Sequence, residues 1–212
     1  MLPLDVDFLV ARILYANSCT TESLRDMANR IESTASLILP GITLDAVAYA
    51  CTSATVAIGA EGIVDSIGKV HPGVGVATPI TAATDAMRRL GASKIAVLAP
   101  YLEETSENVF RYFRDVGFDV VNSMALGIES DYDIAAVDVD TILAACEKLD
   151  GSDVEAIFLS CTGLTTVHLI DKLEQRHGKP VLTSNQCLLW QSLHIAGTPT
   201  NSVIGYGKIF DS

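Results

Sequence analysis

Basic residues are scarce in this sequence. Lys and Arg together number 14, against 26 Asp and Glu, and the formal net charge is −12. Because no run of Lys or Arg offsets this charge, nucleic acids and anionic membrane surfaces are poor partners. The charge-free stretch 46–60 is shorter than the roughly 20 apolar residues of a membrane span, and residues 1–10 carry no basic residue of a signal peptide. We therefore expect a cytoplasmic protein that binds neither nucleic acid nor membrane.

Signatures of cofactor binding are missing as well. The stretch 73-GVGVAT-78 lacks the final Gly of a dinucleotide-binding turn, and neither a GxxxxGK[ST] nor a GxSxG motif occurs. The four His residues do not have metal-ligand spacing. The five Cys residues are odd in number and form no CxxC pair, as expected of reduced thiols. The sequence predicts no organic cofactor and no metal.

What the sequence does contain is a regular alternation of short apolar runs and helical stretches. Hydrophobic residues make up 49% and charged residues 19%, which is enough for a large core and excludes disorder. The near-continuous runs indicate strands that are covered on both faces, and strand–helix alternation predicts an α/β fold with parallel sheets. The expected strands are 5–13, 44–51, 74–79, 94–101, 119–128, 156–161 and 180–185. The expected helices lie near 22–36, 53–67, 81–90, 104–116, 138–149, 165–177 and 186–196.

The alternation repeats within the chain. One strand ends in Ala-Cys-Thr-Ser at Cys51 and another ends in Ser-Cys-Thr-Gly at Cys161, 110 residues later. The segment 5–13 matches 119–128 at a similar offset. The repeat predicts two flavodoxin-like lobes related by a pseudo-dyad, with lobe one at 1–90 plus 188–212 and lobe two at 91–187. On this pattern the first strand of lobe one, with its loop, is absent from the chain.

The two matching cysteines are candidate catalytic groups. In parallel sheets, ligands bind at the carboxyl ends of strands, where both Cys51 and Cys161 lie. Each is followed by an expected helix start, whose N–H groups lower a thiol pKa. We expect thiolate near neutral pH, and carboxylate binding by the donors at Thr52, Ser53, Thr162 and Gly163. Two opposed thiols suit proton transfer at a carbon, or nucleophilic addition on one face of a small carboxylate.

The segments 50-ACTSATVAIG-59, 94-KIAVLAPYLEETSENV-109, 159-LSCTGLTT-166 and 180-PVLTSNQCLLW-190 resemble the aspartate/glutamate racemase superfamily. Within it the chain is most similar to maleate cis-trans isomerases, ectoine-utilisation protein A and arylmalonate decarboxylases. The resemblance implies that Cys51 and Cys161 are catalytic and that Tyr101 contacts substrate, together with Thr52, Ser53, Thr162 and Gly163. It also implies that family members are often homo-oligomers.

The resemblance leads us to expect a cofactor-independent isomerase of the maleate type. An Asp/Glu-type racemase and an ectoine-utilisation protein are alternatives. Arylmalonate decarboxylases have Gly in place of the first cysteine, so the presence of Cys51 argues against decarboxylation. In the isomerases an Asn follows the strand that here ends near Gly127, and Tyr132 lies near the corresponding place.

Other interpretations stay open. A thiol hydrolase would need a base beside one sulfur. A binding or regulatory protein would need neither thiol for its effect on ligands. An inactive fragment would expose an unpaired strand edge at 5–13. Of the remaining cysteines, Cys146 and Cys187 are expected to be packing residues in helices, and Cys19 lies in a loop without a matching partner.

Overall fold

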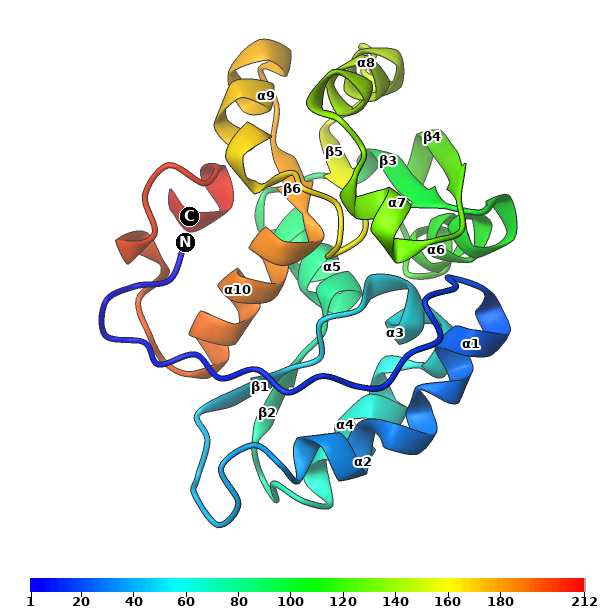
Figure 1. Cartoon of the computed structure of the whole chain (residues 1–212). Coiled ribbons are helices and arrows are strands. Elements are labelled where there is room, and N and C mark those ends of the chain that lie inside the picture. Colours follow the sequence, from blue (N-terminus) through cyan, green and yellow to red (C-terminus); the bar gives the residue numbers. More distant parts are fainter. Residues whose placement is uncertain (212) are drawn as a thin grey trace.

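The structure is a computed structural model and describes residues 1–211. It contains one sheet of two strands and one of four, with strand orders β1-β2 and β4-β3-β5-β6. Every strand pair is parallel. The predicted α/β fold is confirmed (Figure 1). The strands are β1 Ala46–Ala48, β2 Gly75–Ala77, β3 Lys94–Tyr101, β4 Asp119–Ile128, β5 Ala156–Leu159 and β6 Val181–Thr183.

The larger sheet forms the centre of the main hydrophobic core. All residues of β5 and all but Lys94 of β3 are buried, as their unbroken apolar sequences predict. Phe113 of α6 packs edge-to-face on Phe158 of β5, with ring centroids 5.3 Å apart. The helices that surround this sheet are α5 Pro79–Arg89, α6 Glu103–Asp115, α7 Asp131–Ala135, α8 Val139–Leu149, α9 Ile170–His177 and α10 Ser184–Ile195.

The smaller sheet has its own core, formed with α1 Thr21–Asp26, α2 Ala28–Ala35, α3 Thr52–Ile58 and α4 Ala60–Gly68. The helix α10 leaves β6 of the large sheet and packs against β1 and β2 (Figure 1). A Cβ atom on Gly75 would lie 2.3 Å from Cγ2 of Ile195, so glycine is what lets α10 approach β2 this closely. Since α10 includes residues 187 and 188, it spans the predicted lobe boundary.

The expected strand at 5–13 is wrong. This segment has no strand conformation and runs across the molecule toward α1 (Figure 1). Phe8, Leu9 and Val10 are 64%, 52% and 72% exposed. An apolar run alone does not make a strand, because a strand also needs a hydrogen-bonded neighbour. The unpaired strand edge expected there is therefore not present either.

Some element boundaries also differ from expectation. The helix expected at 22–36 is divided between α1 and α2 at Met27. The helix expected at 53–67 is divided between α3 and α4 at Gly59, whose φ of +91° breaks the helical path. The helix expected near 165–177 begins with the 3₁₀ turn η1 Val167–Leu169 and continues as α9, whereas α7 and the short 3₁₀ turns η2 Thr200–Ser202 and η3 Lys208–Asp211 were not predicted.

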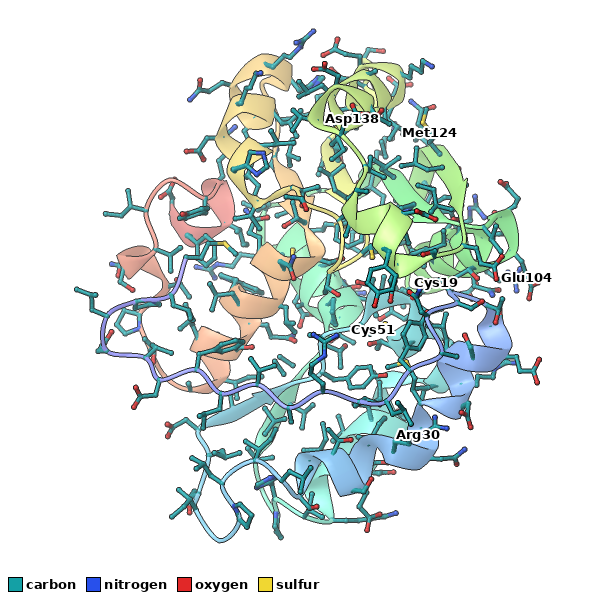
Figure 2. The ribbon with its side chains drawn as sticks, in the orientation of Figure 1. Cys19, Arg30, Cys51, Glu104, Met124 and Asp138 are labelled. Carbon is teal, nitrogen blue, oxygen red and sulfur yellow. The ribbon has the colours of Figure 1, made fainter. Side chains whose placement is uncertain are left out.

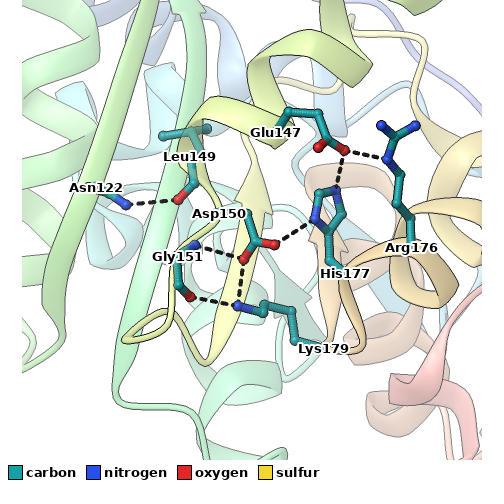
Figure 3. Close-up of polar contacts among 8 residues, drawn as sticks. All are labelled: Asn122, Glu147, Leu149, Asp150, Gly151, Arg176, His177 and Lys179. Atoms are coloured by element: carbon teal, nitrogen blue, oxygen red, sulfur yellow. Dashed lines mark hydrogen bonds and ion pairs between the residues drawn. The ribbon is translucent and has the colours of Figure 1, made fainter.

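A polar cluster joins the ends of α8 and α9 to the start of β6 (Figure 3). Asp150 accepts hydrogen bonds from Nζ of Lys179 at 2.5 Å and from the N–H of Gly151 at 2.8 Å, and its other oxygen lies 2.8 Å from Nδ1 of His177. Desolvation raises the pKa of Asp150, but its bonds to Lys179 and His177 outweigh this and lower it overall. The cluster therefore fixes the connections at the end of the large sheet where β6 begins.

Candidate active site

Cys51 lies between β1 and α3, where its extended backbone caps the helix. The backbone N–H groups of Ala54 and Ser53 point at the sulfur, and Oγ of Ser53 lies 3.8 Å from it. Burial raises the pKa of the Cys51 thiol, and these donors lower it by less. The expectation that the helix N-terminus lowers this pKa and gives a thiolate near neutral pH is therefore wrong. Desolvation of the buried thiol raises its pKa by more than the N–H groups at the helix N-terminus lower it.

Cys161 follows β5 in a turn rather than at a helix start, since the next helical residues begin at Val167. Its φ is +89°, a region that L-residues rarely adopt and that is associated with strain at functional sites. The N–H of Gly163 donates to the Cys161 sulfur at 3.3 Å. Burial raises the pKa of the Cys161 thiol to about 12, against the lowering effect of the Gly163 N–H.

The two cysteine loops are joined directly. Thr162 donates from Oγ1 to the carbonyl oxygen of Ala50 at 2.8 Å, and the Asn185 side chain donates to the carbonyl oxygen of Thr162 at 2.9 Å. A negative charge on Cys51 raises the pKa of Cys161, so the two sulfurs interact electrostatically. The structure thus brings together the two cysteines that the internal repeat singled out.

The hydroxyl groups expected to bind substrate are partly engaged within the protein. Oγ1 of Thr52 donates to Oγ of Ser184 at 2.8 Å, and Thr52 is buried. The Thr162 hydroxyl proton goes to Ala50, as described above. Among the serine and threonine hydroxyl groups expected at the site, that of Ser53 lies near a thiol, 3.8 Å from the Cys51 sulfur. Both threonines therefore form hydrogen bonds between the two lobes.

Tyr101 ends β3 and is buried beside the thiols. Its Oη lies 3.3 Å from Oγ of Ser160, and it also hydrogen-bonds the Cys161 side chain. Burial raises the pKa of Tyr101 well above its ordinary value, and negative charge on Cys161 or Cys51 raises it further. The phenol therefore stays neutral and can donate a hydrogen bond to one sulfur.

A third thiol, that of Cys19, was not among the residues expected at the site. Sγ of Cys19 donates to Oδ1 of Asp131 at 3.1 Å and accepts from the Tyr15 hydroxyl at 3.3 Å. The pKa of Tyr15 is raised mainly by burial, with contributions from charge on Cys19, Asp131 and Cys51. Figure 2 shows Cys19 and Cys51 in the middle of the molecule, consistent with this interaction. Tyr132, the residue expected near this place, is instead 78% exposed.

A sequence signal for this third group does exist. The stretch 17-NSC-19 precedes 129-ESD-131 by 112 residues, close to the 110 that separate Cys51 from Cys161. The two stretches touch, because the N–H of Cys19 donates to the carbonyl oxygen of Glu129 at 3.0 Å. Extending the internal repeat to these loops would have paired them.

A cavity of about 230 Å³ lies between α1, α3 and α6. Ser53 lines it beside Thr105, Arg25 and Arg111, whereas neither Cys51 nor Cys161 does. This cavity is therefore not a pocket between the two thiols. Within residues 1–211, no three His, Cys, Asp or Glu side chains gather as a metal site. No helix in that range is long and apolar enough to span a membrane.

The fold and site define a class of two-lobed α/β proteins with a thiol at the carboxyl end of a strand in each parallel sheet. The chain belongs to the arylmalonate decarboxylase family, whose match covers residues 2–210. It is 29% identical over 141 residues to the arylmalonate decarboxylase of Bordetella bronchiseptica, covering 66% of this chain but 59% of that protein. It is 28% identical to the maleate isomerase of Geobacillus stearothermophilus, covering 82% of this chain and 72% of that one.

Solved structures give the same relationship. The crystal structure of a maleate isomerase from Pseudomonas putida with maleate superposes with a TM-score of 0.83 at 26% identity. That comparison covers 94% of this chain and 81% of the isomerase. The agreement in fold extends over both sheets, so the two-lobe architecture is that of this family.

Proposed function

We propose that this protein is a cofactor-independent isomerase or racemase of a small carboxylate, and that Cys51 and Cys161 carry the reaction. The observation that supports this most directly is the hydrogen bond from Thr162 to Ala50, which joins the two cysteine loops at matching strand ends. Tyr101 and Ser53 each contact one of the sulfurs and complete the proposed site. Thr52 and Gly163, expected to bind substrate, are proposed to shape it.

The leading reaction is cis-trans isomerisation of the maleate type, because several relatives are maleate isomerases. The Cys51 thiol would lose its proton to a substrate carboxylate as its sulfur adds to one alkene carbon, and the Cys161 thiol would donate a proton to the other carbon. The former double bond then rotates as a single bond. Return of that proton to Cys161 expels the Cys51 sulfur, which regains its own proton, and leaves the trans acid with no net change in protons.

Racemisation is the second candidate and uses the same two sulfurs. One thiolate removes the α-proton, and the other thiol delivers a proton to the opposite face. The pair of thiols exchanges roles at each turnover. A hydrolase that uses Cys51 or Cys161 gains no support from three of the histidines, because His71 bonds to the carbonyl oxygen of Ala35, His177 pairs with Asp150 and His194 stacks on Trp190.

The test is turnover of maleate to fumarate, and α-proton exchange of amino acids in heavy water, both followed by NMR. Cys51→Ser and Cys161→Ser should each lower turnover by at least about 100-fold, since each removes a group that moves a proton or forms a bond. Cys146→Ala, in the buried face of α8, is the matched control and should keep full turnover. Full activity in either serine variant would contradict the proposal.

Location and assembly belong to the same proposal. All five cysteines are free thiols, which fits a reducing compartment such as the cytoplasm. We further propose a homo-oligomer. Sedimentation of the purified chain, with and without a reducing agent, tests the proposed assembly.

A further inference from the structure

The helix α7 lies over the turn that carries Cys161. Ile134 is completely buried, and its Cγ2 lies 3.9 Å from the place where a Cβ on Gly163 would be. Asp131 and Ile134 are three residues apart and therefore share one face of the helix. The backbone of α7 thus directs the Asp131 carboxylate toward the side of the molecule where the thiols lie.

Hydrogen bonds hold Asp131 in place, but one of its two carboxylate oxygens has no hydrogen-bond donor within residues 1–211. Oδ1 accepts the hydrogen bond from Cys19 at 3.1 Å, and the N–H of Asp131 donates to Oδ1 of Asn17 at 3.2 Å. Asn17 adopts a φ of +55°, and Ser18 bonds to the Glu129 side chain at 2.8 Å, so the facing loop is fixed as well. Within residues 1–211, Oδ2 of Asp131 accepts no hydrogen bond, and Asp131 is partly exposed. One carboxylate oxygen is therefore available to a ligand.

The Asp131 carboxylate is the charged group among the side chains that interact with the thiols. Its negative charge contributes to the raised pKa of Cys19, of Cys51 and of Cys161, after the larger effect of burial. The remaining contacts to these sulfurs, within the part of the chain that is described, come from hydroxyl and N–H groups rather than from Lys or Arg. A second carboxylate on a substrate would meet repulsion here, whereas an ammonium group would meet a partner.

We propose that Asp131 is a specificity-determining residue, and that it selects substrates carrying one carboxylate together with an ammonium or other hydrogen-bond-donating group over dicarboxylates. The inference rests on the proposed function, in which the thiols act on a small carboxylate. Of the two candidate reactions, it favours the second, racemisation of an amino-acid type of substrate, over the isomerisation of a dianion that the relatives indicate. The substrate carboxylate would face the N–H and hydroxyl donors around the thiols, and its cationic group would face Oδ2 of Asp131.

The test compares two acids of the same chain length, succinate and 4-aminobutyrate. Binding is measured by calorimetry on the full chain, for the wild type and for Asp131→Asn. The amide keeps the size of the side chain and can still accept from Cys19, while it removes the charge. Asp133→Asn is the matched control, because Asp133 lies on the same helix and is exposed.

The wild type should bind 4-aminobutyrate more tightly than succinate. Asp131→Asn should weaken the binding of 4-aminobutyrate about tenfold to a hundredfold, which is the range for a charged hydrogen bond. The same substitution should strengthen the binding of succinate. Asp133→Asn should leave the ratio unchanged. Equal or tighter binding of succinate by the wild type, no binding of either acid, or a ratio that Asp131→Asn leaves unchanged overturns the inference.

This measurement is independent of the proposed reaction. Cys51→Ser should abolish turnover while leaving the ratio of the two affinities close to that of the wild type, because Asp131 is untouched. Retained turnover in Cys51→Ser would reject the proposed function. A wrong affinity ratio with lost turnover would reject the role of Asp131 alone.

Discussion

The loops of Cys51 and Cys161 start from the same sequence pattern and end in different environments. Cys51 is partly exposed and faces two backbone N–H groups and the Ser53 hydroxyl. Cys161 is 7% exposed, has a left-handed backbone and receives one backbone N–H, that of Gly163. A symmetric pair of motifs thus gives an asymmetric pair of thiols. Under the proposed function, this difference favours Cys51 as the nucleophile or base of the first step and Cys161 as the acid.

The largest expected effect of this asymmetry is in chemical reactivity. At pH 8, iodoacetamide should modify Cys51 at least about tenfold faster than Cys161, because the thiolate is the nucleophile and Cys51 is both more exposed and better supplied with donors. Mass spectrometry of peptides after timed quenching measures both rates in one sample. Cys146, which is fully buried, serves as the internal standard for an unreactive thiol. Equal rates at the two sites would remove the basis for assigning separate roles.

The pKa of Cys161 also predicts how stability depends on pH. Its ordinary value is 9.0, and the folded protein raises it to about 12. Above pH 9 the unfolded chain releases this proton while the folded chain retains it, so the contribution of Cys161 to stability is lost as the pH rises from about 9 toward about 12. Cys161→Ser should flatten the fall in melting temperature over this range. An identical fall in the variant would show that Cys161 does not titrate as the structure indicates.

The strained backbone of Cys161 should have a smaller effect, which concerns the stability of glycine and alanine variants. The sign of this effect should be opposite at Cys161 and at Cys51. Glycine adopts a φ of +89° freely, whereas alanine does not, so Cys161→Gly should be more stable than Cys161→Ala by about 1 kcal/mol. At Cys51, where φ is −142°, the order should reverse, because glycine there only adds freedom to the unfolded chain. Chemical denaturation of the four variants measures both differences. A Cys161→Ala variant as stable as Cys161→Gly, or more stable, would mean that the φ of Cys161 stores no strain.

Much of this fold was predictable, because burial on both faces leaves an unbroken apolar sequence. The runs at β3 and β5 are of this kind, and their strands lie where expected. The run at 5–13 is interrupted by Asp5, Asp7 and Arg12 and has no partner strand, and its apolar residues alone do not reveal that a partner is missing. The helix α7 escaped prediction because its five residues are too few to show a period.

The sequence predicted Cys51 and Cys161 of the candidate site but not Cys19 and Asp131. The repeat alone located Cys51 and Cys161. The asymmetry between them was invisible, because the sequence after each cysteine gives no measure of burial or of the backbone angle. Cys19 and Asp131 were missed for a different reason: each is ordinary in its own segment, and their meaning comes from a contact of 3.1 Å between residues 112 positions apart.

The smallest predicted effect concerns the donor that distinguishes Cys51 from Cys161. The Ser53 hydroxyl lowers the pKa of Cys51, and its removal in Ser53→Ala should raise that pKa and slow alkylation of Cys51 by a factor of about 3 to 10, as expected for one net hydrogen bond. Cys161 receives no bond from Ser53, so its rate should not change. Ser66→Ala, in which the hydroxyl bonds to the Gly62 carbonyl on exposed α4, is the matched control. If Ser53→Ala slowed both thiols equally, the two loops would respond as one unit, and the difference between them would come from their coupling rather than from their separate donors.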